Sequence, residues 1–253
     1  MTAPVIDIYA IDLSMEDGLL RREQSLLSKE EQAQAQRYVL PQLSRRYTAA
    51  HTALRRILGK YARTDPRQLA IAKGPYGKPY LPQHPHIAFN LSHSEDLALI
   101  AVTAGSTADN PIRLGIDLEY CRRSPAFIKI SGRYFTDAER AELPSWQSPE
   151  FAKEFLRLWT GKEAVTKCLG TGLRTPLRDF GIHFREKQNA QVQWHISPEP
   201  ARLFVREIDL SPCLNNMKQG EKPGQVPPMY LASLCSGAAG FDYKLNRYSP
   251  TEA

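Results

Sequence analysis

The chain has 253 residues, of which 42% are hydrophobic and 24% charged, and its formal net charge at pH 7 is +6. That composition is ordinary for a globular protein, and the length allows one large domain or two modest ones. The longest strongly apolar run, 97–104, is far shorter than the about 20 residues that a membrane-spanning helix needs, so we expect no membrane segment.

The N-terminus and the cysteines favour an intracellular setting. Residues 1–10 include Asp7 and have no basic segment before an apolar core, so we expect no signal peptide. The four cysteines are scattered without a C-x-x-C pair, which is typical of free thiols in a reducing cytosol. We therefore expect a cytoplasmic protein, and we expect it to be a monomer.

The first half of the chain is expected to form helices and then strands. Ser28 and Glu31 match a capping box, which opens a helix that ends near Val39. A longer helix is expected over 42–62. Strands are expected near 68–73, 86–91 and 97–103.

The second half is expected to repeat this order. Apolar residues over 151–169 recur with a helical period, Ser148 and Pro149 offer the start of that helix, and Gly170 offers its end. Strands are expected near 180–185, 191–196, 203–208 and 229–235, with a long loop over 210–228 and a loosely held tail over 237–253.

A carboxylate pair lies on a predicted strand. Apolar residues alternate with polar ones over 113–119, so Asp117 and Glu119 project from the same face. Adjacent carboxylates repel each other unless a cation intervenes, and Mg²⁺ prefers such hard oxygen ligands. The alternative is the exposed polar face of an edge strand.

A second set of candidate residues lies on the helix that is expected over 149–169. Trp159, Glu163 and Lys167 are spaced by four and form one stripe, with Lys162 beside it. An ordinary Glu–Lys pair on a solvated face explains the two charges but not the large aromatic residue one turn before them.

Three motifs in this order resemble the signatures of the 4′-phosphopantetheinyl transferase superfamily, in its long, Sfp-type branch. They are Phe-Asn-Leu-Ser-His-Ser at 89–94, Gly-Ile-Asp-Leu-Glu at 115–119 and Trp-Thr-Gly-Lys-Glu-Ala at 159–164. The likeness extends from about residue 45 to about residue 182 and includes Tyr-Gly-Lys-Pro at 76–79.

The resemblance implies a defined reaction. Such enzymes transfer the phosphopantetheine arm of coenzyme A to a serine of an apo carrier protein and release adenosine 3′,5′-bisphosphate. The resemblance implies that coenzyme A is the co-substrate. It also implies a Mg²⁺ ion, with Mn²⁺ as a substitute, that is held by Asp117, Glu119 and Glu163. Glu163 also matches the acceptor of the serine proton, directly or through water, and Lys167 matches the residue that steadies the pyrophosphate.

The resemblance also implies where coenzyme A binds. The matching positions are Arg46, Lys78, Ser92, His93, Lys162 and Lys167. The chain departs from its relatives at 30–34, where Glu-Glu-Gln-Ala-Gln stands in place of lysines. Arg45 or Arg46 is therefore expected to carry more of the phosphate binding.

The fold that the resemblance implies is α+β, with two similar halves related by pseudo-twofold symmetry. Each half would be a long helix packed on a small, mainly antiparallel sheet, with the boundary between 1–110 and 111–253. A weak internal repeat agrees, because a shift of 111 positions places Arg46 on Arg157. The active site is then expected in the cleft between the halves.

The net positive charge favours an anionic partner. The cations are dispersed and the aromatic–basic repeats of an RNA-binding sheet are absent from the sequence, so we expect no nucleic acid. An acidic acyl or peptidyl carrier would dock beside the Asp–Glu strand, although a solvated loop explains the same cations equally well. The candidate docking residues are Arg122, Arg123, Phe127, Ile128 and Arg133.

Two other classes of protein fit the same residues. One is a different Mg²⁺-dependent phosphotransferase or phosphohydrolase that uses the three carboxylates. The other is a non-catalytic binder of acidic partners, in which the carboxylates hold no metal. The residues do not identify the carrier, which could serve fatty-acid, polyketide or nonribosomal peptide biosynthesis.

Overall fold

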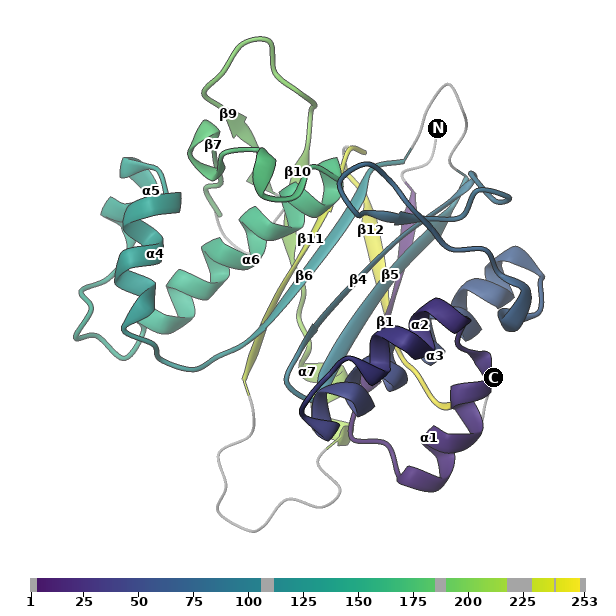
Figure 1. Cartoon of the computed structure of the whole chain (residues 1–253). Coiled ribbons are helices and arrows are strands. Elements are labelled where there is room, and N and C mark those ends of the chain that lie inside the picture. The colour runs from purple at the N-terminus through teal and green to yellow at the C-terminus, as the bar shows by residue number, and fades with distance from the viewer. Residues whose placement is uncertain (1–3, 106–111, 185–189, 218–228, 239, 251–253) are drawn as a thin grey trace.

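The structure is a computed structural model, and it describes residues 4–105, 112–184, 190–217, 229–238 and 240–250. These residues form a mixed α+β fold, which confirms the predicted class (Figure 1). The helices are α1 (Asp17–Glu23), α2 (Lys29–Gln36), α3 (Pro41–Ala62), α4 (Ala126–Tyr134), α5 (Asp137–Glu142), α6 (Phe151–Leu169) and α7 (Ser211–Met217). Within the described ranges, no helix is long and apolar enough to span a bilayer.

Two four-stranded sheets form the centre of the molecule. The first has the order β12-β1-β5-β4, in which β1 pairs antiparallel with β5 and parallel with β12. The second has the order β6-β11-β10-β8, and its pairs are antiparallel. The strands are β1 (Val5–Asp12), β4 (Ile87–Ser94), β5 (Leu97–Ala104), β6 (Leu114–Tyr120), β8 (Ala190–Gln191), β10 (Phe204–Glu207), β11 (Tyr230–Ser236) and β12 (Asp242–Arg247). Two short ribbons pair β2 (Ala72–Lys73) with β3 (Pro79–Tyr80), and β7 (Phe180–Gly181) with β9 (Gln193–Trp194).

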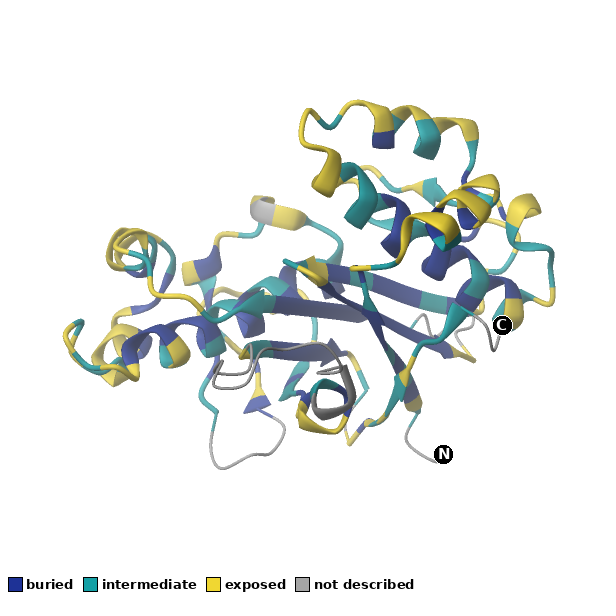
Figure 2. Ribbon diagram, turned by 90° about the horizontal axis from the view of Figure 1, so that it is seen from below, coloured by how far each residue is buried: buried dark blue, intermediate teal, exposed yellow. Residues whose placement is uncertain are grey.

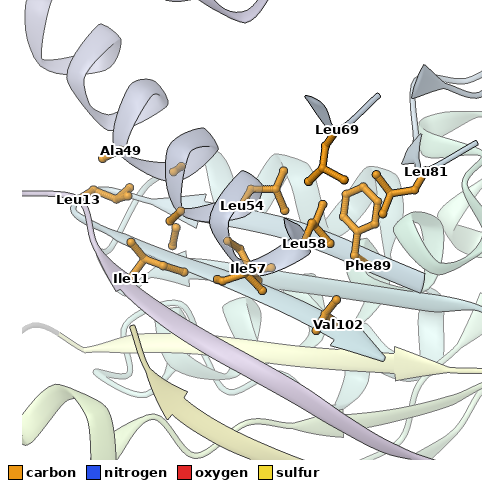
Figure 3. Packing of buried hydrophobic residues seen from close by; sticks show 14 of the residues in the cluster. Ile11, Leu13, Ala49, Leu54, Ile57, Leu58, Leu69, Leu81, Phe89 and Val102 are labelled. Atoms are coloured by element: carbon orange, nitrogen blue, oxygen red, sulfur yellow. The ribbon is translucent and has the colours of Figure 1, made fainter. Parts of the chain in front are cut away.

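Each sheet is covered by one long helix. Leu54, Ile57 and Leu58 of α3 pack on the first sheet, where they meet Phe89 and Val102 (Figure 3). Helix α6 packs on β6 and β11 of the second sheet. The sheet faces that α3 and α6 leave free pack against each other, so the central strands are mostly buried, whereas shorter helices such as α2, α4 and α5 keep exposed faces (Figure 2).

Predictions for the long helices and the central strands are confirmed with small shifts in their ends. Helix α2 has the full capping box of Ser28 and Glu31, although it ends at Gln36. Helix α6 ends at Leu169 and is capped by Gly170, as predicted, with the Gly170 φ at +74°. Its start was predicted wrongly, because Glu150 precedes the first helical residue without a side-chain cap.

The predicted loop over 210–228 is wrong in its first part, which forms α7. Ser211 donates from its backbone and its hydroxyl to the Asp209 carboxylate, which satisfies the start of this helix. Buried Leu210 and Cys213 then anchor it to the core. Residues 218–228 lie outside the described residues.

The predicted loose tail over 237–253 is also wrong. Its middle forms β12, which pairs with β1 at the opposite end of the chain. Phe241 is buried, and Tyr243 and Leu245 pack on the core between the sheets. These contacts hold the end of the chain as a strand.

Three predicted strands are shorter than expected. Pro66–Gln68 forms a 3₁₀ turn capped by Asp65, so the strand predicted over 68–73 starts at Ala72. The one predicted over 180–185 keeps Phe180–Gly181, and residue 185 lies outside the described residues. The one predicted over 191–196 is split into β8 and β9, because Val192 donates its backbone N–H to Leu203 instead.

Candidate active site

The candidate site lies where β4 of the first sheet runs beside β6 of the second (Figure 1). Side chains of β4 join the two strands. Asn90 accepts from the backbone N–H of Ile116 at 2.8 Å, and the Ser94 hydroxyl accepts from that of Tyr120 at 3.0 Å. Between these contacts the Ser92 hydroxyl donates to Asp117 at 2.9 Å. The alternation of a strand therefore turns every second residue of the first motif toward the second motif.

Gly115 brings the third motif to the same place. A Cβ at this residue would lie 2.1 Å from the backbone oxygen of Ala164 and 2.4 Å from the backbone nitrogen of Cys168. Only glycine therefore allows α6 to pack so closely on β6. This contact places Glu163 and Lys167 over the strand that carries Asp117.

Lys167, Asp117 and Ser92 form a hydrogen-bonded triangle. The Lys167 Nζ lies 2.6 Å from Asp117 Oδ1 and donates to the Ser92 hydroxyl at 2.9 Å. Asp117 is 4% exposed, and its second oxygen, Oδ2, is buried without a hydrogen-bond partner. An unpaired carboxylate oxygen at this depth is costly unless a cation or a donor binds it.

The other two carboxylates flank Asp117. Burial raises the pKa of Glu119, and repulsion from Asp117 raises it further. Burial and the same repulsion raise the pKa of Glu163. The Ser94 hydroxyl opposes the shift at Glu119 by donating to that carboxylate at 3.2 Å. The three acids are therefore close enough to repel one another.

The donor set suits a divalent cation, although the side chains do not converge tightly. Across the described ranges, no three His, Cys, Asp or Glu side chains are grouped closely enough to form a metal cluster. The Lys167 ammonium instead lies against Asp117. The free Oδ2 atom and the mutual repulsion of hard oxygen donors nevertheless fit a cation such as Mg²⁺.

His93 and Arg46 lie together beside this cluster and line one pocket of about 210 Å³. Burial lowers the pKa of His93, and the charge of Lys167 lowers it further. Arg46 forms ion pairs with two carboxylates of the turn between β4 and β5, at 3.0 Å from Glu95 and 2.8 Å from Asp96. Arg45 instead forms an ion pair with Asp17.

Lys78 and Lys162 do not join the cluster. Lys78 donates to the backbone oxygens of Leu114 and Cys168, at 2.9 and 3.0 Å, and so ties β6 to the end of α6. Lys162 is fully buried, where it pairs with Glu139 at 2.9 Å and donates to two backbone oxygens beyond α6. Burial lowers the pKa of both lysines.

The candidate docking residues for a carrier lie on and just before α4. Ile128 is 49% exposed, whereas the Phe127 ring stacks on Phe155 with centroids 4.1 Å apart. Arg122 and Arg123 are exposed, and the Arg123 guanidinium lies 4.3 Å from the Trp146 ring centroid. Arg133 lies over the Tyr134 ring at 5.2 Å.

A larger pocket of about 700 Å³, between α2, α3, the β2–β3 ribbon and β4, was not predicted. Tyr47 and His51 line it, and their rings stack 4.0 Å apart. Their spacing of four on the predicted helix was the available signal. Glu31 lies at its edge, where it caps α2 and pairs with Arg55 rather than standing free.

Comparison with known proteins places this arrangement in a family. Residues 113–217 match the model of the 4′-phosphopantetheinyl transferase superfamily, and residues 17–105 match the model described as 4′-phosphopantetheinyl transferase, N-terminal. The 4′-phosphopantetheinyl transferase HetI of Nostoc sp. strain PCC 7120 is 34% identical over 191 residues, which cover 74% of this chain and 78% of HetI. The 4′-phosphopantetheinyl transferase Sfp of Bacillus subtilis strain 168 is 26% identical over 197 residues, or 78% of this chain and 83% of Sfp. The chain therefore belongs to the 4′-phosphopantetheinyl transferase superfamily.

Proposed function

We propose that this 4′-phosphopantetheinyl transferase moves the phosphopantetheine arm of coenzyme A to a serine hydroxyl of an apo acyl or peptidyl carrier protein. The serine oxygen forms a new bond to phosphorus, the bond to the leaving phosphate breaks, and adenosine 3′,5′-bisphosphate departs. The observation that carries the proposal is the free Oδ2 of buried Asp117, beside a lysine and between two further carboxylates.

Asp117, Glu119 and Glu163 would hold Mg²⁺, or Mn²⁺ in its place. Such an ion, when bound with the pyrophosphate, neutralises charge on the transferred and leaving phosphates. The raised pKa values of Glu119 and Glu163 support this assignment, because a cation would offset the repulsion that raises them.

Lys167 and Glu163 would act directly on the reacting groups. The Lys167 ammonium supplies positive charge beside the place where negative charge develops. Glu163 would accept the proton of the attacking serine, directly or through water. Ser92 would hold the Asp117 and Lys167 side chains in position, because its hydroxyl is hydrogen-bonded to both.

Coenzyme A would place its 3′-phosphate near His93 and Arg46 and its adenosine in the neighbouring pocket around Tyr47 and His51. The two pockets adjoin, because Tyr47 lines both of them. Lys78 and Lys162 would support coenzyme A binding through the elements that they hold rather than by contact. Their Nζ atoms are already bonded to buried carbonyl oxygens.

The acidic carrier would dock on α4 and the segment before it. Ile128 offers the exposed apolar contact, while Phe127 supports the helix from inside. Arg122, Arg123 and Arg133 would steer the carrier, since exposed charges chiefly raise association rates and are screened by salt.

Charge reversal tests the docking surface. Replacing the three arginines by glutamate should slow modification of the carrier and flatten its dependence on ionic strength, while coenzyme A binding is kept. Arg67→Glu, an exposed reversal elsewhere in the chain, is the matched control. Parallel salt curves for the reversed and wild-type proteins would contradict this docking surface.

We also propose that the two helix-covered sheets are pseudo-twofold halves, divided near residue 110. Each proposed half is a four-stranded sheet covered by one long helix, which supports this symmetry. Strand β12 departs from it, because it comes from the end of the chain and joins the first sheet. A cytoplasmic monomer remains our expectation for the whole protein.

Intact mass spectrometry of apo carriers tests the function. After incubation with coenzyme A and Mg²⁺, the carrier should gain one phosphopantetheine arm, and a carrier with Ser→Ala at the acceptor should gain none. Hydrolysis of coenzyme A without modification of any tested carrier would favour a phosphohydrolase and refute the transferase.

A further inference from the structure

A carboxylate lines the same small pocket as His93 and Arg46. This pocket lies between α3 and the end of β4, and Glu95 closes it on the side of the turn that follows β4. The inference below rests on the proposed function, because it takes this pocket as the site of the 3′-phosphate.

Glu95 occupies a backbone conformation that favours glycine. Its φ is +48°, in the left-handed region where a side chain is disfavoured. Its carboxylate lies 3.0 Å from Arg46 and 3.3 Å from Arg122. Strained residues of this kind concentrate at functional sites and persist where surrounding contacts hold them. The two-residue turn that joins β4 to β5 accounts for this backbone conformation. The position of the carboxylate between Arg46 and Arg122 is the feature that bears on ligand binding.

The charges around Arg46 do not favour a phosphate. Glu95 and Asp96 both bind its guanidinium, so the positive charge of Arg46 is already paired with two carboxylates. Asp96 lines a different cavity, on the other side of Arg46. Of these two carboxylates, Glu95 alone lines the pocket with His93. A dianionic phosphate placed there would be repelled by Glu95 while it is attracted by Arg46.

We infer that Glu95 determines specificity by offsetting the charge of Arg46 inside the 3′-phosphate pocket. It narrows the preference of the enzyme for coenzyme A over 3′-dephospho-coenzyme A. Removing the charge of Glu95 should therefore increase the preference for coenzyme A, whereas removing His93 should decrease it.

Binding of the two ligands by calorimetry, with kcat/KM for both in the carrier assay, tests the inference. In Glu95→Gln the affinity for coenzyme A divided by that for 3′-dephospho-coenzyme A should rise by about five-fold. That factor is the energy expected for a partly exposed charge pair. Glu95→Gly should shift the ratio in the same direction at an unchanged or higher melting temperature, because glycine relieves the strain at positive φ.

Asp96→Asn is the matched control, since it removes the other carboxylate bound to Arg46 from outside the pocket. A smaller shift in Asp96→Asn than in Glu95→Gln supports a role inside the pocket, and equal shifts would overturn it. An unchanged ratio in Glu95→Gln would also overturn it.

The same measurements separate this inference from the proposed function. If the wild-type protein prefers coenzyme A and His93→Ala lowers that preference, the phosphate pocket stands whatever Glu95 does. If wild-type, His93→Ala and Glu95→Gln proteins all bind the two ligands alike, the phosphate pocket is misassigned and the inference fails with it.

Discussion

Replacing Asp117 by asparagine should abolish most catalysis while leaving the fold in place. Asparagine keeps the size of the side chain and its contact with Ser92, but it removes the charge that faces Lys167 at 2.6 Å. It also removes the anionic Oδ2 atom, to which we assign the metal. We expect kcat to fall by about 100-fold or more, which corresponds to roughly 2.7 kcal/mol in the activation barrier.

The effect of the same change on stability should be much smaller, because two terms oppose each other. The lost ion pair with Lys167 is partly exposed to water on the lysine side and is discounted for that reason. Removing the charge also relieves the repulsion that raises the pKa values of Glu119 and Glu163. We expect a net change within about 1 kcal/mol, or roughly 2–4 °C in melting temperature for a chain of this size.

Three measurements on the Asp117→Asn protein decide the matter: the single-turnover rate of carrier modification, the melting temperature, and Mn²⁺ binding by calorimetry. Asp137→Asn, whose side chain is 81% exposed and pairs with Arg178, is the control and should behave as wild type. A nearly unchanged rate in Asp117→Asn would refute the metal assignment. A loss of activity accompanied by unfolding would instead show that the Asp117 carboxylate stabilises the fold.

Further predictions follow from other parts of the site. His93→Ala should weaken coenzyme A by about ten-fold more than 3′-dephospho-coenzyme A, as expected for a hydrogen bond to a charged phosphate, and calorimetry with both ligands checks this. Gly115→Ala should prevent close packing of α6 and lower the melting temperature strongly, since its Cβ would lie 2.1 Å from the Ala164 oxygen. Without metal, Glu163→Gln should be more stable than wild type at neutral pH, because the folded protein raises the pKa of this acid and loses the associated stability as pH rises through it. That difference should vanish below the ordinary glutamate pKa of about 4.3, and melting temperatures across the pH range would show whether it does.

The central elements could be predicted because their signals are local. The helical period of 151–169 and the alternation over 113–119 are each patterns within one element. In β6 both faces are buried, because α6 covers the face that carries Asp117. These elements carry Asp117, Glu163 and Lys167, so most of the proposed metal and pyrophosphate site could be predicted from the sequence.

The edges of the fold depend on distant parts of the chain, and their signals are weaker. Strand β12 is stabilised by pairing with β1, whose residues lie at the other end of the sequence. The alternation of buried Ile6, Ile8 and Ala10 in β1 was present in the sequence, and its partner β5 was predicted, but its other partner β12 was not. Short strands gain much of their stability from such partners, so they are poorly predicted one segment at a time.

The lysines show why residue type alone does not assign a ligand site. Lys162 and Lys167 lie on one helix, yet a separation of five residues turns them to different sides of α6. Lys167 points to Asp117 at the edge of the site, whereas Lys162 is buried against Glu139 and backbone oxygens. Removing Lys162 would leave the buried Glu139 carboxylate without its partner, so this loss would disturb the position of α6 and the activity together. The helix therefore combines residues for chemistry with residues that hold it in place, and the direction of each side chain separates the two.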